Sequence, residues 1–201
     1  MNASPLRIGV LGSGKGSNLA AILRSIQAGE LNAVVSIVLS DNPTAGILTI
    51  GREHGLPTEA LPVSKFRSKL EPEIETLAAE KLAAAQTDLI VLAGYMRMVK
   101  APLLGPFSDR IINVHPSLLP SFPGLDAWKQ ALEAKVPETG CTVHWVDSGM
   151  DTGEIIAQAA VPVLPTDTPE TLHLRIQEAE HKLYPACLAV IAGNPARAGS
   201  V

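Results

Sequence analysis

The fold is decided by the stretch Arg7-Ile8-Gly9-Val10-Leu11-Gly12-Ser13-Gly14-Lys15-Gly16-Ser17-Asn18. A short apolar run leads into a loop rich in glycine and serine, and residues 17–28 then place apolar side chains at helical spacing. The stretch therefore predicts a buried strand, a loop and a helix. Such a unit is the usual start of a parallel sheet that is covered by helices on both faces.

Strands and helices continue to alternate along the rest of the chain. Residues 87–93 are apolar almost throughout, which is typical of a strand buried on both faces. Two later runs lie close together in sequence and are expected to pair antiparallel. The expected strands are 7–11, 33–39, 56–63, 87–93, 110–114, 142–146 and 154–163, and the expected helices are 17–28, 44–54, 65–85, 126–134 and 169–191. We therefore expect an α/β fold: a single-domain, doubly wound, mostly parallel sheet with helices on both faces and a late antiparallel pair.

The composition indicates one globular domain that handles small molecules. With 201 residues, 46% hydrophobic and 18% charged, the chain can build one well-buried domain, which we expect to span residues 1–201. The 16 Lys and Arg are scattered among 20 Asp and Glu, so no basic stripe indicates a nucleic-acid partner. A small-molecule substrate is therefore favoured.

Cysteine content and hydropathy predict a cytoplasmic protein without a membrane role. Cys141 and Cys187 are too few for a disulfide framework or a metal set, and no charged and then apolar leader opens the sequence. No apolar run approaches the ~20 residues that span a bilayer. We expect no metal, and we expect the last nine residues, rich in Pro and Gly, to form a loose tail.

The loop Gly12-Ser13-Gly14-Lys15-Gly16-Ser17-Asn18 is expected to hold a phosphate, because free backbone N–H groups and the helix dipole favour an anion there. Gly16 stands where a P-loop needs Ser or Thr, and Ser17 stands where a dinucleotide site needs its third glycine. Neither fingerprint is complete. The remaining interpretation is a compact loop that binds a phosphate, with Ser17 and Asn18 as side-chain donors. The competing interpretation is an ordinary turn capped by Ser17.

A second polar cluster follows the strand at 110–114. Asn113 and His115 are two residues apart, so their side chains leave the same face of an extended strand. An amide donor and an imidazolium held by a carboxylate suit a reaction in which an amine attacks a carbonyl and an oxyanion forms. Asp151, between Gly149 and Gly153, is the candidate carboxylate. The predicted catalytic set is Asn113, His115 and Asp151.

Structural roles compete with this interpretation. Asn113 could cap a turn, His115 could be a hydrogen-bonded and partly buried histidine, and Asp151 could belong to a glycine-flanked turn. Packing or hydrogen bonds to residues of the site are enough to account for the other histidines, His54, His144, His173 and His181, and solvation is enough for Glu180 of the last helix. Neither a nucleophile elbow nor an H-E-x-x-H or paired-cysteine motif occurs, which disfavours nucleophilic and metal mechanisms.

The segment Asn113-Val114-His115-Pro116-Ser117-Leu118-Leu119-Pro120, with Pro123-Gly124 and Asp151-x-Gly153, closely resembles the folate-dependent formyltransferase family. The loop Ser13-Gly14-Lys15-Gly16-Ser17-Asn18-Leu19 and the run Leu92-Ala93-Gly94-Tyr95-Met96-Arg97 resemble the branch that uses glycinamide ribonucleotide. The resemblance implies the formyltransferase fold and transfer of a formyl group from the co-substrate 10-formyltetrahydrofolate to the amine of glycinamide ribonucleotide, in de novo purine (IMP) synthesis. It also implies a phosphate-binding half, about 6–110, and a folate-binding and catalytic half, about 111–193.

The resemblance also assigns roles to individual residues. Asn113, His115 and Asp151 match the family's catalytic set, in which Asp151 pairs with His115 and helps a water to move the proton. Glu180 matches an acidic residue that contacts the ribose, which reverses its interpretation as a solvated charge. The implied ribonucleotide residues are Gly16, Ser17, Asn18 and Glu180, and the implied folate residues are Lys69, Met96, Arg97, Met98, Val99, Asn113, Asp147 and Asp151.

Some positions depart from the family pattern, and other functions compete. Asp126 and Trp128 stand where some relatives carry histidines, and Ser121 replaces a common lysine. A formyltetrahydrofolate deformylase would pass the formyl group to water, but we expect it to have an extra N-terminal domain and no ribonucleotide loop. A relative that formylates methionyl-tRNA would carry a further basic domain. A non-catalytic folate- or nucleotide-sensing module would not need the intact catalytic set. We expect a monomer or homodimer.

Overall fold

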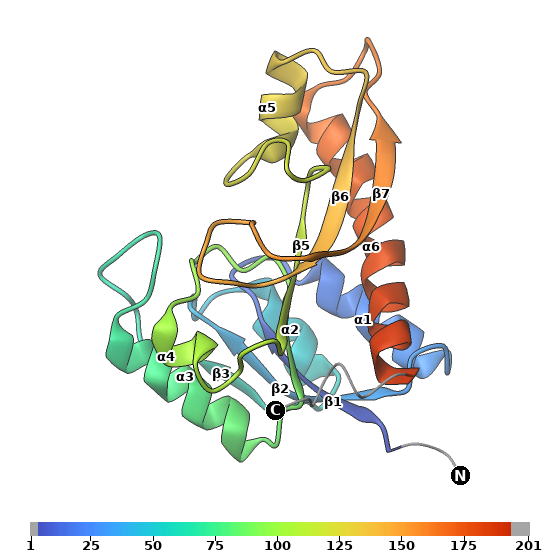
Figure 1. Ribbon diagram of the computed structural model, residues 1–201. Helices are drawn as coiled ribbons and strands as arrows, with labels where there is room; N and C mark the ends of the chain where they lie inside the picture. The colour runs from blue at the N-terminus through green and yellow to red at the C-terminus, as the bar shows by residue number, and fades with distance from the viewer. Residues whose placement is uncertain (1–3, 194–201) are drawn as a thin grey trace.

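Seven strands form one sheet in the order β3-β2-β1-β4-β5-β6-β7 (Figure 1). The computed structural model describes residues 4–193. The strands are β1 (Leu6–Leu11), β2 (Ala33–Ser40), β3 (Thr58–Ala60), β4 (Leu89–Leu92), β5 (Ile111–His115), β6 (Glu138–Trp145) and β7 (Ile155–Pro162). The helices are α1 (Ser17–Gln27), α2 (Gly46–Glu53), α3 (Pro72–Ala84), α4 (Ala101–Leu104), α5 (Ala127–Glu133) and α6 (Pro169–Gly193).

The sheet is parallel from β3 to β5 and antiparallel from β5 to β7. This confirms the predicted doubly wound sheet with a late antiparallel pair. The chain leaves β1 toward β2 on one side and returns to β4 on the other, so the strand order reverses between β1 and β4. Ligands of such sheets bind beyond the carboxyl ends of the strands at this point. There, the N–H of Ser13 bonds the carbonyl of Gly94 at 3.1 Å, which joins the two loops.

Alternate residues of the central strands enter two separate cores. Ile8, Leu89 and Ile112 face a core completed by α1, α2 and α6, whereas Ile90 and Ile111 face one completed by α3 and α4. The apolar strands are therefore covered on both faces, as their near-continuous hydrophobicity indicates.

Some predicted boundaries were wrong, because proline restricts the chain. Helix α3 begins at Pro72 rather than near residue 65, since the residue before a proline is driven out of the helical region, and Glu71 is extended (ψ 148°). Strand β3 shrinks to three residues between Pro57 and Pro62. Strand β6 starts four residues earlier than expected, and the short α4 was not predicted. The expected C-terminal tail lies outside the described residues apart from Gly193, which ends α6.

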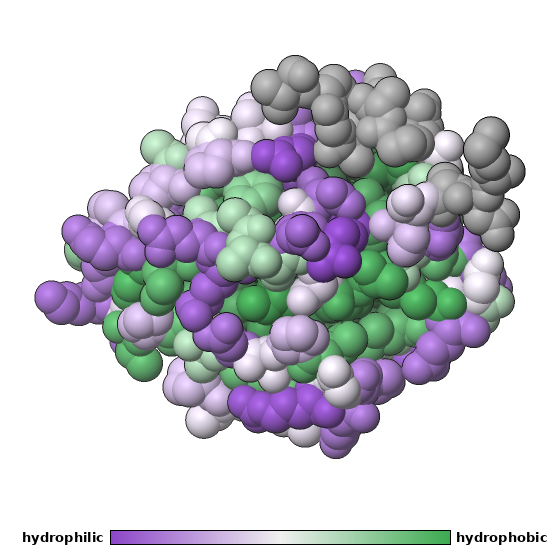
Figure 2. All heavy atoms as spheres, turned by 90° about the horizontal axis from the view of Figure 1, so that it is seen from below, coloured by the Kyte–Doolittle hydropathy of each residue, from purple (hydrophilic) through white to green (hydrophobic). Residues whose placement is uncertain are grey.

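The lower end of the molecule in Figure 1 shows a broad hydrophobic area that hydrophilic side chains border and interrupt (Figure 2). Apolar atoms contribute much of the surface of folded domains, so this area does not by itself identify a site. Within residues 4–193, no helix combines the length and apolar character that crossing a bilayer requires.

Candidate active site

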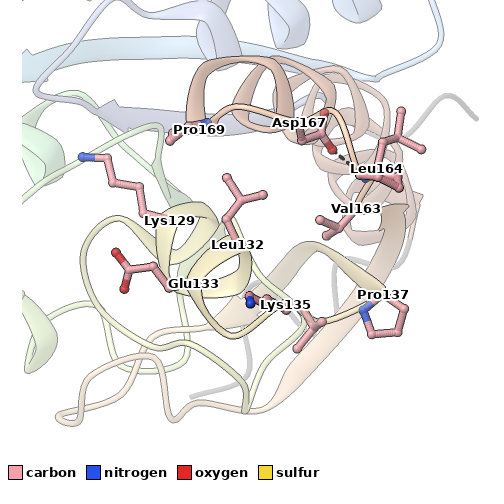
Figure 3. A pocket seen from close by; sticks show the side chains of 11 residues that line it. Lys129, Leu132, Glu133, Lys135, Pro137, Val163, Leu164, Asp167 and Pro169 are labelled. Carbon is pink, nitrogen blue, oxygen red and sulfur yellow. Dashed lines mark hydrogen bonds between the residues drawn. The ribbon is translucent and has the colours of Figure 1, made fainter.

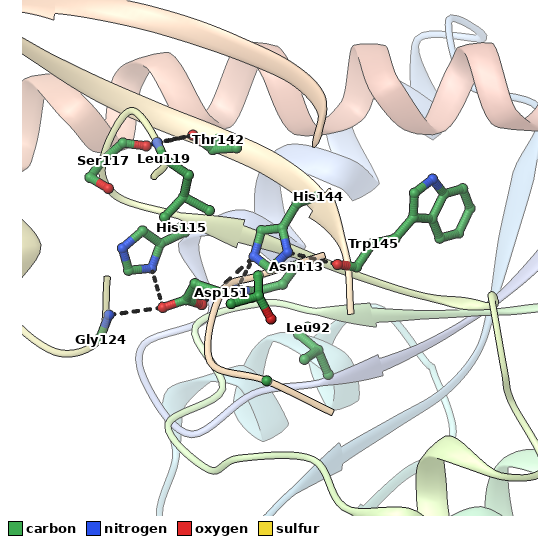
Figure 4. A network of polar contacts seen from close by, with 12 residues as sticks. Leu92, Asn113, His115, Ser117, Leu119, Gly124, Thr142, His144, Trp145 and Asp151 are labelled. Carbon is green, nitrogen blue, oxygen red and sulfur yellow. Dashed lines mark hydrogen bonds and ion pairs between the residues drawn. The ribbon is translucent and has the colours of Figure 1, made fainter. Parts of the chain in front are cut away.

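The fold brings His115 and Asp151 together at the end of β5 (Figure 4). His115 is 4% exposed, and its Nδ1 lies 3.4 Å from Asp151 Oδ2. Its Nε2 lies 2.9 Å from the carbonyl oxygen of Phe122. Because that carbonyl can only accept, Nε2 carries the proton and donates. The Nδ1 edge meets a carboxylate at a distance longer than an ordinary hydrogen bond, so it is the edge that can still engage another group.

Asp151 is held in place by the loop that follows β5. The N–H of Gly124 donates to Asp151 Oδ2 at 2.8 Å. The backbone of Asp151 has φ 55°, a left-handed conformation that Asp tolerates better than most residues. Asp151 does belong to a tight turn, but that turn aims its carboxylate at His115. Asn113 lies within β5 and caps no turn.

His144, which the sequence interpretation explained by packing or by bonds to residues of the site, contacts both Asn113 and Asp151. Its Nε2 lies 3.2 Å from Asn113 Nδ2 and 3.7 Å from Asp151 Oδ1. Burial lowers the pKa of His144, so the ring is neutral, and its Nδ1 lies 2.8 Å from the carbonyl of Trp145. Nδ1 therefore donates, and Nε2 accepts from the Asn113 amide. His144 thus orients Asn113.

The turn after His115 is fixed by Thr142, which lies opposite His115 in the β5–β6 register. Thr142 Oγ1 donates to the carbonyl of Ser117 at 2.6 Å and accepts from the N–H of Leu119 at 3.0 Å. Gln158 Nε2 adds a bond to Thr142 Oγ1 at 2.9 Å. The first two of these bonds are buried, and together the three hold the start of the loop that carries Phe122 and Gly124 to the site.

The glycine loop leaves several backbone donors unused. Gly16 precedes α1 with φ 84°, and no side chain among the described residues caps this helix, so the competing interpretation of an ordinary turn capped by Ser17 does not hold. A Cβ on Gly16 would lie 2.7 Å from the Cα of Ile47, which explains why glycine is needed there. In the described part of the chain, the N–H groups of Ser17, Asn18 and Leu19 have no protein acceptor. A helix start with free N–H groups attracts an anion.

Asn18 and Glu180, 162 residues apart, meet beside this loop. Asn18 Nδ2 donates to Glu180 Oε2 at 2.9 Å, and Asn18 Oδ1 is buried and accepts no hydrogen bond from any residue that the structure describes. Glu180 is 6% exposed, and burial raises its pKa to about 7 although the Asn18 bond opposes this. Tyr184, one turn later on α6, donates to the carbonyls of Leu92 and Ile112 and anchors the helix against β4 and β5. Glu180 is therefore a buried acid that can exchange a proton near neutrality.

The segment after β4 is held along one edge only. The N–H of Met96 bonds Ser13 Oγ at 2.9 Å, and the N–H of Met98 bonds the carbonyl of Ser68 at 2.8 Å. Lys69 pairs with Met98 as an isolated β-bridge. The N–H groups of Arg97 and Val99, which alternate with these, bond no acceptor among residues 4–193. These two N–H groups are therefore available to donate to a ligand.

Other predicted residues shape the loops around the site. The Arg97 side chain turns inward and binds Asp41 Oδ2 at 2.6 Å, and Val99 enters the core, so both offer mainly backbone groups outward. Asp147 Oδ1 accepts from the N–H of Gly149 at 2.9 Å and from Thr152 Oγ1 at 2.7 Å. It therefore orders the loop that ends at Asp151.

The positions that depart from the family pattern are structural here. Asp126 precedes α5 with φ 56°, and its Oδ2 lies 3.2 Å from Lys129 Nζ. Trp128 stacks on His173 with centroids 3.8 Å apart and an interplanar angle of 3°, which packs α5 on α6. The Ser121 carbonyl accepts from the Ser117 hydroxyl. None of the three replaces a member of the predicted catalytic set.

A separate hollow of about 700 Å³ lies between α5, the end of β7 and the start of α6 (Figure 3). Its lining is mostly apolar but also includes the charged residues Lys129, Glu133, Lys135 and Asp167. It contains none of the predicted site residues, so it is distinct from the cluster around His115. Between residues 4 and 193, no group of three His, Cys, Asp or Glu side chains is arranged to hold a metal ion.

Comparison with known proteins identifies the family. Residues 6–188 match the formyl transferase family. This chain is a member of that family. The family predicted from the segment around Asn113 and His115 is therefore confirmed, and the geometry above describes a formyl transferase fold.

Individual family members agree with this assignment. The chain is 40% identical over 187 residues to phosphoribosylglycinamide formyltransferase of Bacillus subtilis, covering 93% of this chain and 95% of that protein. It is 45% identical over 193 residues to the trifunctional purine biosynthetic protein adenosine-3 of Drosophila pseudoobscura, but it spans only 14% of that relative's length. The solved glycinamide ribonucleotide transformylase 1 of Symbiobacterium toebii superposes with a TM-score of 0.90 at 45% identity, covering 96% of this chain and 90% of that one.

Proposed function

We propose that this protein transfers the formyl group of 10-formyltetrahydrofolate to the amine of glycinamide ribonucleotide, a step of purine synthesis. The observation that carries the proposal is the cluster of Asn113, His115 and Asp151 at the carboxyl end of β5, beside a loop with free N–H groups. The names of its relatives, phosphoribosylglycinamide formyltransferase and glycinamide ribonucleotide transformylase, support this choice of substrates.

The reaction is a direct attack of the amine on the formyl carbon, which gives a tetrahedral intermediate. The bond from that carbon to the folate nitrogen then breaks, and the folate nitrogen leaves with the proton that the amine has lost. Asn113 donates one N–H to His144, and its second N–H is available for the formyl oxygen as negative charge develops there. His115 donates from its Nδ1 edge to the same oxygen. Asp151, 3.4 Å from that nitrogen, stabilises the imidazolium and helps a water to carry the proton away from the attacking amine. No covalent enzyme intermediate is required.

Gly16, Ser17 and Asn18 hold the phosphate of the ribonucleotide, and Glu180 contacts its ribose. The unused N–H groups at the start of α1 suit a phosphate dianion. The buried Asn18 Oδ1 has no partner among residues 4–193, and burial raises the pKa of Glu180 to about 7, so the pair can accept hydrogen bonds from sugar hydroxyls.

The folate pocket is formed by Met96 to Val99, by Lys69 and by the loop from Asp147 to Asp151. The unused backbone groups of Arg97 and Val99 are those that read the pteridine ring, because Met96 and Met98 are already bonded within the protein. Asn113 and Asp151 close the pocket at the reacting end. Lys69, whose Nζ lies 5.0 Å from the centre of the Phe66 ring, supplies positive charge near the anionic end of the co-substrate.

Both ligands therefore draw on both halves of the chain: the phosphate-binding half, about 6–110, contributes Met96 to Val99 to the folate pocket, and the catalytic half contributes Glu180 to the ribonucleotide site. A cytoplasmic location and a monomeric or homodimeric state stay predictions.

The test is release of tetrahydrofolate from 10-formyltetrahydrofolate with and without glycinamide ribonucleotide. We expect turnover only when the ribonucleotide is present. Equal release without it would support the deformylase, and no release in either case would support a sensing module. His115→Ala is expected to lose nearly all turnover with its fold intact, since removing one oxyanion donor costs on the order of 100- to 1,000-fold.

A further inference from the structure

Two buried carboxylates outside the predicted site bind the segment that follows β4. Asp41, directly after β2, accepts from Arg97 Nε at 2.6 Å, and Glu75 of α3 accepts from the N–H of Lys100 at 3.0 Å. Asp41 is 5% exposed and Glu75 is 2% exposed. The segment is thus attached to β2 near its middle and to α3 at its end.

Each carboxylate keeps one oxygen without a partner. Asp41 Oδ1 and Glu75 Oε2 are buried and accept no hydrogen bond within the described residues. Burial raises the pKa of Glu75, although the Lys100 bond and the charges of Lys100 and Lys69 oppose this. Burying a carboxylate with an unpaired oxygen lowers the stability of a protein, so apolar residues would serve better if packing were the only task.

Both carboxylates act on the same short stretch of backbone. Arg97 also donates from its Nη1 to the carbonyl of Phe66, so its side chain joins β2 and the loop before α3 to the segment. The phenol of Tyr95 lies within the electrostatic reach of both acids, since burial first and then Asp41 and Glu75 raise its pKa. The two acids therefore enclose the part of the segment that runs from Tyr95 to Lys100.

We propose that Asp41 and Glu75 are positioning residues for the folate: they act through Arg97 and Lys100 to hold the free backbone groups of Arg97 and Val99 in place for the pteridine ring. This inference rests on the proposed function. A segment fixed before binding loses less conformational freedom when the ligand arrives, so the fixed segment binds more tightly. Neither acid touches the ligand, and the ribonucleotide site does not depend on them.

The test compares two substitutions at each position. Glu75→Gln keeps an oxygen acceptor for the Lys100 N–H, whereas Asp41→Asn keeps an acceptor but loses the charge that pairs with Arg97. Glu75→Leu and Asp41→Leu keep similar bulk but offer neither an acceptor nor a charge. We expect each Leu variant to raise the KM for 10-formyltetrahydrofolate about tenfold, as loss of one hydrogen bond to a charged group predicts. The KM for the ribonucleotide should change less than about twofold. Glu75→Gln should restore the folate KM almost fully, because Lys100 needs only an acceptor.

Glu59→Gln is the matched control. Glu59 of β3 pairs with Lys81 of α3, so it also joins the sheet to α3, but it touches nothing in the segment after β4. It should leave both KM values unchanged. A purely structural role for Asp41 and Glu75 predicts lower melting temperatures with both KM values unchanged or changed equally, and either result would overturn the proposal.

If the Leu variants do not fold, Asp41→Asn tests the proposal instead, because it removes the charge that holds Arg97. An unchanged folate KM in that variant would also overturn the proposal. Wild-type protein that releases no tetrahydrofolate contradicts the proposed function itself. Normal wild-type turnover with an unshifted folate KM in the folded variants contradicts only this inference.

Discussion

Asn113 of β5 and His144 of β6 lie directly opposite one another in the antiparallel register, with Asn113 Nδ2 3.2 Å from His144 Nε2. Because burial lowers the pKa of His144 and keeps it neutral, and its Nδ1–H donates to the carbonyl of Trp145, Nε2 can only accept. The Asn113 amide is thereby held with its nitrogen toward His144 and one N–H free. The orientation of the proposed oxyanion donor depends on a residue that does not contact the formyl group.

Replacing His144 should therefore lower the catalytic rate more than it weakens binding. His144→Leu removes the acceptor, and we expect kcat to fall roughly tenfold to a hundredfold, somewhat less than direct loss of an oxyanion donor. Both KM values should stay within about threefold, because the substrates contact other residues. Steady-state kinetics with each substrate varied in turn measures this.

His54→Leu is the control for that variant. The His54 ring also lies 2.9 Å from a carbonyl, that of Ile50, but on the exposed surface of α2. It should behave as wild type. An unchanged kcat in His144→Leu would show that Asn113 does not need this orientation.

The role of His144 illustrates what the sequence could not supply. Asn113 and His115 share a strand, so their spacing predicts a common face directly. His144 comes from another strand, and its partner depends on the β5–β6 register, which the sequence does not fix by itself. A polar His within an otherwise buried strand was the available signal, but packing is an equally ordinary explanation for one such residue.

Asn18 should govern the ribonucleotide and not the folate. Asn18→Ala removes the bond to Glu180 and leaves that buried carboxyl unpaired, so the KM for glycinamide ribonucleotide should rise by about tenfold or more. The KM for 10-formyltetrahydrofolate should be unaffected. Ser25→Ala, on the exposed face of the same helix, is the control. Equal increases in the two KM values would indicate that the phosphate binds elsewhere.

Glu180 should make stability fall as pH rises. Its pKa is about 7 in the folded protein against 4.5 as the ordinary value, so the folded state holds a proton that the unfolded state has lost between these limits. The stability that this proton contributes is complete below about pH 4.5 and is lost as pH rises through 7. Relative to Glu180→Gln, wild type should lose a few kcal/mol over this range. Urea unfolding of both proteins at pH 5 and pH 8 measures the difference, and parallel curves would contradict it.

Gly16 and Gly14 offer a matched pair in the phosphate loop. Gly16 has φ 84°, and a Cβ there would meet Ile47, whereas a Cβ on Gly14 would meet nothing within 4 Å. Gly16→Ala should therefore destabilise the protein by more than about 1 kcal/mol and disturb ribonucleotide binding. Gly14→Ala should be nearly neutral in thermal unfolding. If Gly14→Ala destabilised the protein more than Gly16→Ala, the left-handed conformation at Gly16 would not be needed.

The parallel sheet could be predicted from the sequence because its central strands are apolar on both faces. This pattern does not depend on how the individual side chains pack. It misplaced the start of α3 because the Glu, Leu and Ala content of residues 65–85 favours helix throughout, while Pro72 restricts only its own neighbourhood. Asn18 and Glu180 were recognisable only through the family pattern, since 162 residues separate them. Asp41 and Glu75 gave no signal at all, because a lone acidic residue is usually solvated.

The central claim is that Asn113, His115 and Asp151 deliver a formyl group to an amine and not to water. The most direct measurement supplies 10-formyltetrahydrofolate labelled in the formyl carbon together with glycinamide ribonucleotide, and follows where the label goes. The account predicts that wild-type protein places the label on the ribonucleotide, one label for each tetrahydrofolate released, and that His115→Ala places almost none. Label recovered as formate, with the ribonucleotide unlabelled, would contradict it.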